Sequence, residues 1–146
     1  MSDLRARALA YLSRREYSRA ELRRKLSRES VNPDQLDAAL DHLERENFLS
    51  DARFAEQRIA QRSARFGTRR IIAELKQHVL DEAQLASLTA QLRDTELSRA
   101  RAVWEKKFGS APKTPAERAK QMRFLAMRGF DANTITQLFK SHLINQ

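Results

Sequence analysis

The sequence contains no cysteine, and only three glycines and three prolines occur among its 146 residues. The absence of cysteine excludes disulfide bonds, thiolate zinc sites and cysteine nucleophiles. No stretch approaches the roughly 18 apolar residues that a membrane-spanning helix needs. The first residues, MSDLR, lack the apolar run of a signal peptide. We therefore expect a cytoplasmic protein that does not associate with a membrane.

The scarcity of glycine and proline favours helices, because these two residues are the ones that most often interrupt them. The chain is rich in Ala, Leu, Arg, Glu and Gln, which are strong helix formers. No segment shows the alternation of β-branched and polar residues that is typical of a strand. These features predict an all-α protein.

An apolar pattern occurs three times along the chain. Moving 49 residues from Leu26 leads to Leu75, and moving 50 more leads to Leu125. The same offsets relate three further sets: Val31, Leu80 and Phe130; Leu36, Leu85 and Ile135; Leu40, Thr89 and Phe139. Any two amphipathic helices can align in this way, so the repeat needs support from helix-start signals.

Such signals recur along the chain, as pairs of a capping residue with an acidic, amide or proline partner in the first turn. They are Ser18 with Glu21, Asn32 with Pro33, Asp81 with Gln84, and Thr114-Pro115 with Glu117. The predicted helices cover residues 3–15, 19–28, 33–46, 52–65, 68–77, 82–92, 96–107, 115–127 and 132–143. We therefore predict three tandem three-helix modules, at 1–50, 51–94 and 95–146.

Several predicted helices are too short to be stable alone, so their apolar stripes must be packed against one another. The stripes are Leu9, Leu12 and Tyr17; Phe54, Ile59 and Phe66; and Val103, Trp104 and Phe108. We interpret their aromatic residues as core rather than as a stacking surface. The longest loop, 108–114, contains Gly109 and Pro112; we interpret it as a hinge between the second and third modules.

Charge is segregated along the chain, which carries a net charge of +9. Basic and acidic residues number nine and two in 4–28, one and seven in 29–51, seven and two in 52–76, one and four in 77–96, and nine and two in 97–128. Each module therefore places its positive charge on its first two helices. These helices could form a basic stripe suited to a polyanion such as DNA, or to an acidic protein groove. Alternatively, the acidic third helices pair with basic helices of a neighbouring module.

Helical phase and charge together select the candidate contact residues for a partner or for DNA phosphates. They are Arg19, Arg23, Arg24, Arg58, Arg65, Arg69, Arg70, Lys76, Lys120, Arg123 and Arg128. Such residues bind phosphate without reading sequence, so we expect weak, non-specific binding to single- and double-stranded DNA. Arg62 lies at the edge of an apolar face, between Ile59 and Phe66. We expect Arg62 to be partly buried and paired with Asp51 or Glu56.

Three stretches resemble the motifs of the RecX family, in order and over nearly the whole chain. They are ARALAYLSRREYSRAELRRKL at 6–26, NFLSDARFAEQRIAQRSARFGTRRIIAEL at 47–75 and KQMRFLAMRGF at 120–130. The central stretch is the most specific of the three. Ten residues within these motifs, or equivalent to motif residues by the repeat, are interpreted as structural. They are Leu22, Leu26, Asp51, Phe54, Ala55, Arg62, Gly67, Leu75, Gly129 and Phe130.

The resemblance implies tandem three-helix modules in an elongated, curved molecule that binds in the groove of a RecA–DNA filament. It also implies limitation of filament growth, with less ATP hydrolysis, strand exchange and co-protease activity by RecA, and so a role in DNA repair, recombination and the SOS response. The family often has glycine at the joint that Gly129 occupies. By the repeat offsets this joint falls on Ser30 and Val79, so the turn at 77–81 is expected to be built differently.

Two other classes of function are weighed against a filament-binding regulator. A sequence-specific DNA-binding regulator could use the helix pair at 115–143 as a helix-turn-helix, but the third helices are neutral or acidic, which suits a major groove poorly. An enzyme is disfavoured because the three histidines fall in separate modules and no glycine-rich phosphate loop or serine elbow occurs. We therefore predict a monomeric, non-enzymatic protein without cofactor or metal.

Overall fold

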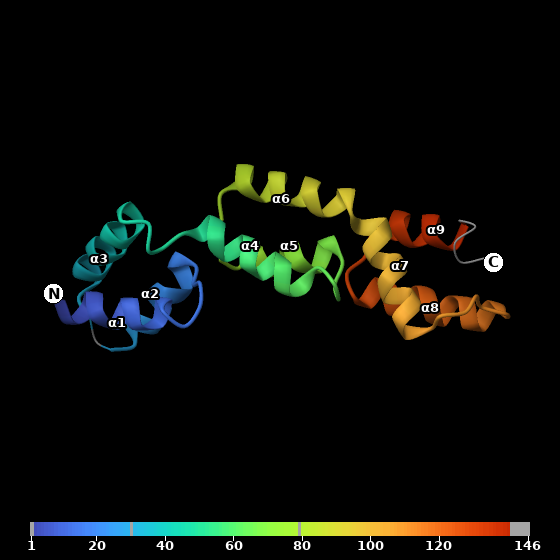
Figure 1. Ribbon diagram of the computed structural model, residues 1–146, viewed down its shortest axis with the longest axis horizontal. Helices are drawn as coiled ribbons and strands as arrows, with labels where there is room; N and C mark the ends of the chain where they lie inside the picture. The colour runs from blue at the N-terminus through green and yellow to red at the C-terminus, as the bar shows by residue number, and fades with distance from the viewer. Residues whose placement is uncertain (1, 30, 79, 141–146) are drawn as a thin grey trace. The chain divides into compact units, whose positions relative to one another are not determined.

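The computed structural model describes residues 2–29, 31–78 and 80–140, and all regular structure in these residues is α-helical (Figure 1). The helices are α1 (Ser2–Leu12), α2 (Arg19–Ser27), α3 (Pro33–Arg45), α4 (Asp51–Arg62), α5 (Thr68–Lys76), α6 (Glu82–Asp94), α7 (Glu96–Lys107), α8 (Pro115–Met127) and α9 (Ala132–Lys140). The predicted all-α class and the order of the helices are confirmed. The part of the last predicted helix beyond residue 140 lies outside the described residues.

Local capping explains where four of these helices begin. The Ser18 hydroxyl accepts a hydrogen bond from the Glu21 backbone N–H at 3.1 Å, and Asn32 Oδ1 accepts from the two residues that follow Pro33. Asp81 and Thr114 cap α6 and α8 in the same way. The predicted start signals are therefore confirmed as caps. The Glu21 side chain binds Arg15 instead of reaching back to close the capping box.

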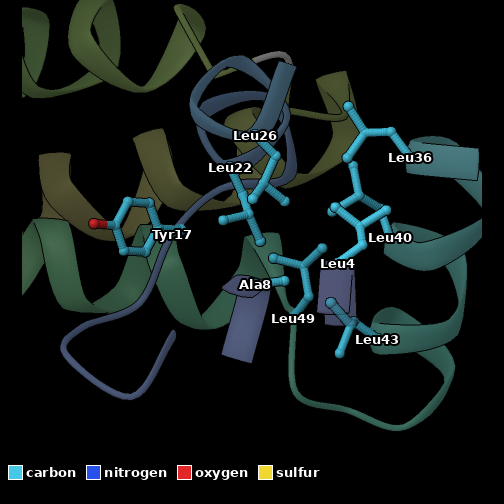
Figure 2. Packing of buried hydrophobic residues seen from close by; sticks show 9 residues of the cluster. All are labelled: Leu4, Ala8, Tyr17, Leu22, Leu26, Leu36, Leu40, Leu43 and Leu49. Carbon is cyan, nitrogen blue, oxygen red and sulfur yellow. The ribbon is translucent and has the colours of Figure 1, made fainter. Parts of the chain in front are cut away.

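The chain packs as two compact units, residues 1–58 with 78–80, and residues 59–77 with 81–146. The core of the first unit consists of leucines from α1, α2, α3 and the segment after α3, together with Ala8 and Tyr17. Figure 2 shows these leucine side chains converging between the helices, while the Tyr17 hydroxyl points away from them. Leu22, Leu26, Leu40 and Leu43 are completely buried.

The second unit contains the end of α4 and helices α5 to α9. Its largest cluster joins α7, α8 and α9 through residues that include Trp104, Leu125, Phe130 and Phe139. Helix α5 packs against α6, and its Ile71 and Leu75 are buried. The equivalent leucines of the predicted repeat, Leu26, Leu75 and Leu125, are all completely buried.

The sequence suggested that the loop at 108–114 is a hinge between the second and third modules, but this interpretation is wrong. The loop joins α7 to α8, which pack directly against each other. Trp104 Nε1 donates a hydrogen bond to Gln121 Oε1 at 2.8 Å, and Gln121 Nε2 donates to the Ser110 carbonyl oxygen at 3.4 Å. The loop at 108–114 is therefore a long turn between two helices that pack against each other.

Gly129 has φ +94°, a backbone conformation that side chains with a Cβ rarely adopt. The prediction that this joint needs glycine is therefore supported at Gly129. The equivalent positions Ser30 and Val79 lie outside the described residues. The limits of the three modules, 1–50, 51–94 and 95–146, stay a prediction.

Replacing Leu75 with Ala should lower the free energy of unfolding by roughly 2–5 kcal/mol, because the side chain is fully buried and a cavity would remain. Phe54→Ala should lower the free energy of unfolding by a similar amount, because the Phe54 side chain is only 1% exposed. Urea denaturation followed by circular dichroism measures both changes. Met127→Ala, at 77% exposure, is the control and should shift stability by less than about 0.5 kcal/mol. An unchanged transition for Leu75→Ala would contradict the core described above.

Candidate functional site

The arginines that point from α2 toward α3 are largely neutralised within the first unit. The Arg19 guanidinium binds the carboxylates of Asp41 and Glu44, and Arg23 Nε lies 2.8 Å from Asp37 Oδ1. Burial of Arg19 opposes its charge, but the hydrogen bonds to Asp41 and Glu44 outweigh it, so its pKa is raised. Two of the predicted contact residues thus already hold acidic partners.

Further pairs hold the first unit together in the same way. They are Arg5 with Glu46, Arg7 with Glu29, Arg15 with Glu21, and Arg53 with Glu16. The alternative in which acidic third helices pair with a neighbouring module is therefore wrong for α3, whose partners lie in α1 and α2 of its own module. Arg58 lies over the Phe54 ring, with its guanidinium carbon 5.0 Å from the ring centre, and Arg24 is exposed.

A group of arginines with a different environment lies in the second unit. The group consists of Arg65, Arg69, Arg70 and Arg128, and we call it the arginine cluster. It forms where the joint between α4 and α5 meets the joint between α8 and α9. Arg69 Nη2 donates to the Ala126 carbonyl oxygen at 2.9 Å, and Arg128 Nη1 donates to the Arg65 carbonyl oxygen at 3.0 Å.

Three members of the cluster surround one aromatic ring. The guanidinium carbons of Arg70, Arg65 and Arg128 lie 4.2, 5.3 and 5.5 Å from the centre of the Phe66 ring. Within residues 2–29, 31–78 and 80–140, no carboxylate oxygen lies within 4.0 Å of a guanidinium nitrogen of the four cluster arginines. No ion pair in the described part of the chain therefore neutralises the cluster, although the Arg69 charge acts on the carboxyl of Asp131, where it opposes the rise in pKa.

Beside Phe66 lies an open cavity of about 510 Å³, whose wall includes Arg62, Arg65, Arg70 and Glu74. Arg62 binds Glu74, with both nitrogen–oxygen distances 3.2 Å. The expected partners of Arg62, Asp51 and Glu56, are therefore wrong. Helix α5 presents Glu74 to the end of α4, and this cannot be read from spacing along α4 alone.

Asp51 binds a backbone group instead of Arg62: its Oδ1 accepts a hydrogen bond from the Arg19 backbone N–H at 2.8 Å. This contact joins the start of α4 to the start of α2 within the first unit. Burial raises the pKa of Asp51, although the hydrogen bond from Arg19 opposes that rise. This contact agrees with a structural role for Asp51, which stays a prediction.

Two glycines allow the joints beneath the arginine cluster to touch. The Gly67 backbone N–H donates to the Arg128 carbonyl oxygen at 2.8 Å, and the Arg69 N–H donates to the Gly129 carbonyl oxygen at 3.2 Å. A Cβ on Gly67 would lie 2.3 Å from the Phe130 backbone nitrogen, and a Cβ on Gly129 would lie 2.4 Å from the Arg70 Cβ. Only glycine, which has no Cβ, allows the two backbones to approach this closely.

Two charged side chains, the buried Glu96 and the half-buried Arg99, hydrogen-bond to the same joint. Glu96 accepts hydrogen bonds from the Thr68 backbone N–H at 3.0 Å and from the Thr134 hydroxyl at 2.7 Å. Arg99 donates to the carbonyl oxygens of Ser63 and Phe66. Together they satisfy backbone groups at the start of α5 and after the end of α4 that would otherwise be unpaired.

The ionisation of this buried group is set by its hydrogen bonds. Burial alone would raise the pKa of Glu96, but the hydrogen bonds from Thr134 and Thr68 outweigh burial, so the pKa is lowered. Asp131 lies beside Glu96, and burial together with the Glu96 charge raises its pKa. The pKa of Glu96 thus lies below, and that of Asp131 above, the ordinary value of each group.

The other predicted contact residues are not brought into the arginine cluster. Lys76 is exposed on α5, and Lys120 and Arg123 are exposed on α8. Glu96 and Arg99 are not among the residues predicted from the sequence, where Arg99 counts only toward the basic charge of 97–128. No local motif marks these two residues, because their partners lie 28 to 38 residues away in the sequence.

No helix in the described part of the chain is long and apolar enough to cross a membrane. The family model of the third three-helix domain of RecX matches residues 94–139, and the models of the first and second domains match residues 5–43 and 50–86. These matches cover most of the chain.

Curated relatives named regulatory protein RecX match nearly the whole chain. The protein from Ralstonia nicotianae is 50% identical over 94% of this chain and 87% of its own length. The protein from Herminiimonas arsenicoxydans is 48% identical over 99% of this chain and 95% of its own. The crystal structure of RecX from Lactobacillus salivarius shares the fold, with a TM-score of 0.81 at 19% identity, and covers 95% of this chain and 94% of that one.

The glycine contact yields a stability prediction. Gly67→Ala should lower the free energy of unfolding by roughly 1–3 kcal/mol or more, because its Cβ would overlap the Phe130 backbone. Gly109→Ala is the comparison, since Gly109 has φ +73° but its Cβ would lie 3.2 Å from its nearest neighbour. That change should cost about 1–2 kcal/mol through backbone strain alone. Urea unfolding and hydrogen exchange of the Gly67 and Arg69 amides measure the two effects. Faster exchange in Gly109→Ala than in Gly67→Ala would contradict this account.

Proposed function

Since the chain belongs to the RecX family, we propose that it is a regulator that inhibits the RecA recombinase. In this proposal it binds in the groove of the RecA–DNA filament and limits filament extension. The consequence would be less ATP hydrolysis, strand exchange and co-protease activity by RecA. A regulatory role agrees with the name of the curated relatives, regulatory protein RecX. The chain would act as a monomer in the cytoplasm, and the hydrolysed ATP would be bound by RecA.

The observation that carries the proposal is the arginine cluster. A filament that contains DNA presents phosphates, and arginine binds phosphate through a planar fork of N–H donors. Phosphate contacts position a protein on nucleic acid without reading its sequence. This agrees with a regulator that follows a filament over any DNA sequence. The remaining candidate residues, including Lys76, Lys120 and Arg123, would add contacts on α5 and α8.

The alternative of a sequence-specific DNA-binding regulator finds less support in α9, which would have to be the recognition helix. Its Ile135, Leu138 and Phe139 are buried, and the Thr134 hydroxyl is already bound to Glu96. A recognition helix needs several polar side chains free to reach base edges near its N-terminus. Tight binding to one duplex sequence that resists salt would nevertheless favour this alternative.

The direct test is ATP hydrolysis by RecA on single-stranded DNA, with this protein titrated at fixed salt. We expect hydrolysis to fall, and filaments seen by electron microscopy to shorten. Inhibition well below equimolar protein would favour action at filament ends or cooperative disassembly. Unchanged hydrolysis and filament length at saturating protein, with circular dichroism confirming a folded chain, would refute the proposal.

Charge reversal at Arg69, Arg70 and Arg123 to Glu should keep the fold and weaken the inhibition of RecA. All three side chains are exposed, so the helical content and the thermal transition should change little. The matched control reverses Arg14, Arg28 and Arg45, which are exposed residues of the first unit outside the candidate set. Inhibition that survives the first change, or is lost equally in the control, would place the contact surface elsewhere.

A further inference from the structure

We infer that the arginine cluster, with Phe66 and the cavity beside it, is a binding site for single-stranded nucleic acid. Arg65, Arg70 and Arg128 would hold consecutive phosphates, and the cavity lined by Phe66 and Arg70 would take a base. The inference rests on the proposed function only for its biological setting, because binding to bare nucleic acid can be measured without RecA.

The first step is the concentration of charge. The guanidinium carbons of Arg65, Arg70 and Arg128 all lie within 5.5 Å of the centre of the Phe66 ring. Any two of these carbons are therefore at most twice that distance apart. This separation is comparable with the Debye length of ~8 Å at physiological ionic strength, so salt screens their repulsion only in part. A chain of phosphates would relieve that repulsion.

The second step is the availability of hydrogen-bond donors. In the described residues, the guanidinium groups of Arg65 and Arg70 donate no hydrogen bond to the protein. The Phe66 ring supports them instead, by contact between the guanidinium groups and the aromatic ring. Their N–H groups therefore remain available to an anion. Holding the guanidinium groups in place beforehand lowers the entropy lost on binding.

The third step is the aromatic wall, which favours a nucleic-acid strand over an acidic protein. The cavity of about 510 Å³ is lined by Phe66, Ile71 and Ala73 as well as by arginines. An unpaired base can stack on an aromatic ring or on an arginine plane, whereas an Asp or Glu side chain offers no such surface. Glu74 also faces this cavity, but it is bound by Arg62 and so repels phosphate less.

The fourth step is the choice of a single strand over a duplex. The bases of a duplex are stacked on one another inside it, so a cavity of this kind could take a base only after unpairing. Proteins that bind single strands without reading sequence commonly combine a positive groove with aromatic side chains, because every base has a π-face. In the first unit, by contrast, Arg19 and Arg23 bind carboxylates of α3. Arg15, which lies over the Tyr17 ring there, is bound to Glu21.

The experiment measures binding of the full chain to a fluorescein-labelled single-stranded oligothymidine and to a duplex of equal length, by anisotropy over a range of salt. The test variant carries Arg65→Gln, Arg70→Gln and Arg128→Gln. The matched control carries Arg14→Gln, Arg28→Gln and Arg45→Gln, which remove equal charge from exposed positions of the first unit. Thermal unfolding verifies that both variants are folded.

We expect the test variant to bind the single strand at least tenfold more weakly, and its plot of log affinity against log salt to be shallower by about two, since each phosphate contact contributes about 0.7. The control should change affinity by less than threefold. Phe66→Leu, which keeps an apolar side chain, should weaken single-strand binding severalfold and leave duplex binding unchanged.

Three outcomes would overturn the inference. They are equal losses in the test and control variants, no binding of the single strand up to ~100 µM protein at low salt, and a test variant that loses RecA inhibition while binding the oligonucleotide normally. The last outcome would leave the proposed function standing and identify the cluster as a protein contact. Conversely, weakened strand binding together with unchanged RecA hydrolysis by the wild-type chain would support the inference and refute the proposed function.

Discussion

The arginine cluster depends on one close backbone contact, the crossing of the joints at Gly67 and Gly129. Each glycine leaves room for the backbone of the other joint, and a Cβ at either place would lie within 2.5 Å of its neighbours. Because the crossing fixes where α5 begins, it fixes Arg65, Arg69 and Arg70 as well. Arg128 immediately precedes Gly129, so the same contact brings it to Phe66.

A contact this close leaves little room for side-chain caps, and the polar groups at the joint are satisfied from elsewhere. Glu96 accepts from the start of α5, and Arg99 donates to carbonyl oxygens just beyond α4. Burying charges is unfavourable unless hydrogen bonds compensate for lost water. Here the charged residues replace water around backbone groups that the crossing makes inaccessible. The arrangement therefore couples α7 to the joint that positions the cluster.

The helices could be predicted closely from the sequence because their signals are local. Caps such as Ser18, Asn32 and Thr114 act within three residues, and apolar spacing marks Leu26, Leu75 and Leu125 as core. The partners of the charged residues could not be predicted in the same way. Arg62 binds Glu74 on the next helix, and Glu96 binds Thr134 across 38 residues. Such pairs depend on tertiary packing, which spacing along one helix does not encode.

Net charge likewise predicted that a basic surface exists without predicting where it lies. Residues 4–28 and 97–128 carry the same excess of seven basic residues. In the first unit, however, the strongly acidic segment that follows folds back onto the basic one, and its carboxylates bind Arg19 and Arg23. Residues 129–146, in contrast, contain one acidic and one basic residue, Asp131 and Lys140. Which helix packs against which therefore decides which arginines are paired, and the packing of the second unit leaves Arg65, Arg70 and Arg128 beside Phe66 without an ion pair in the described residues.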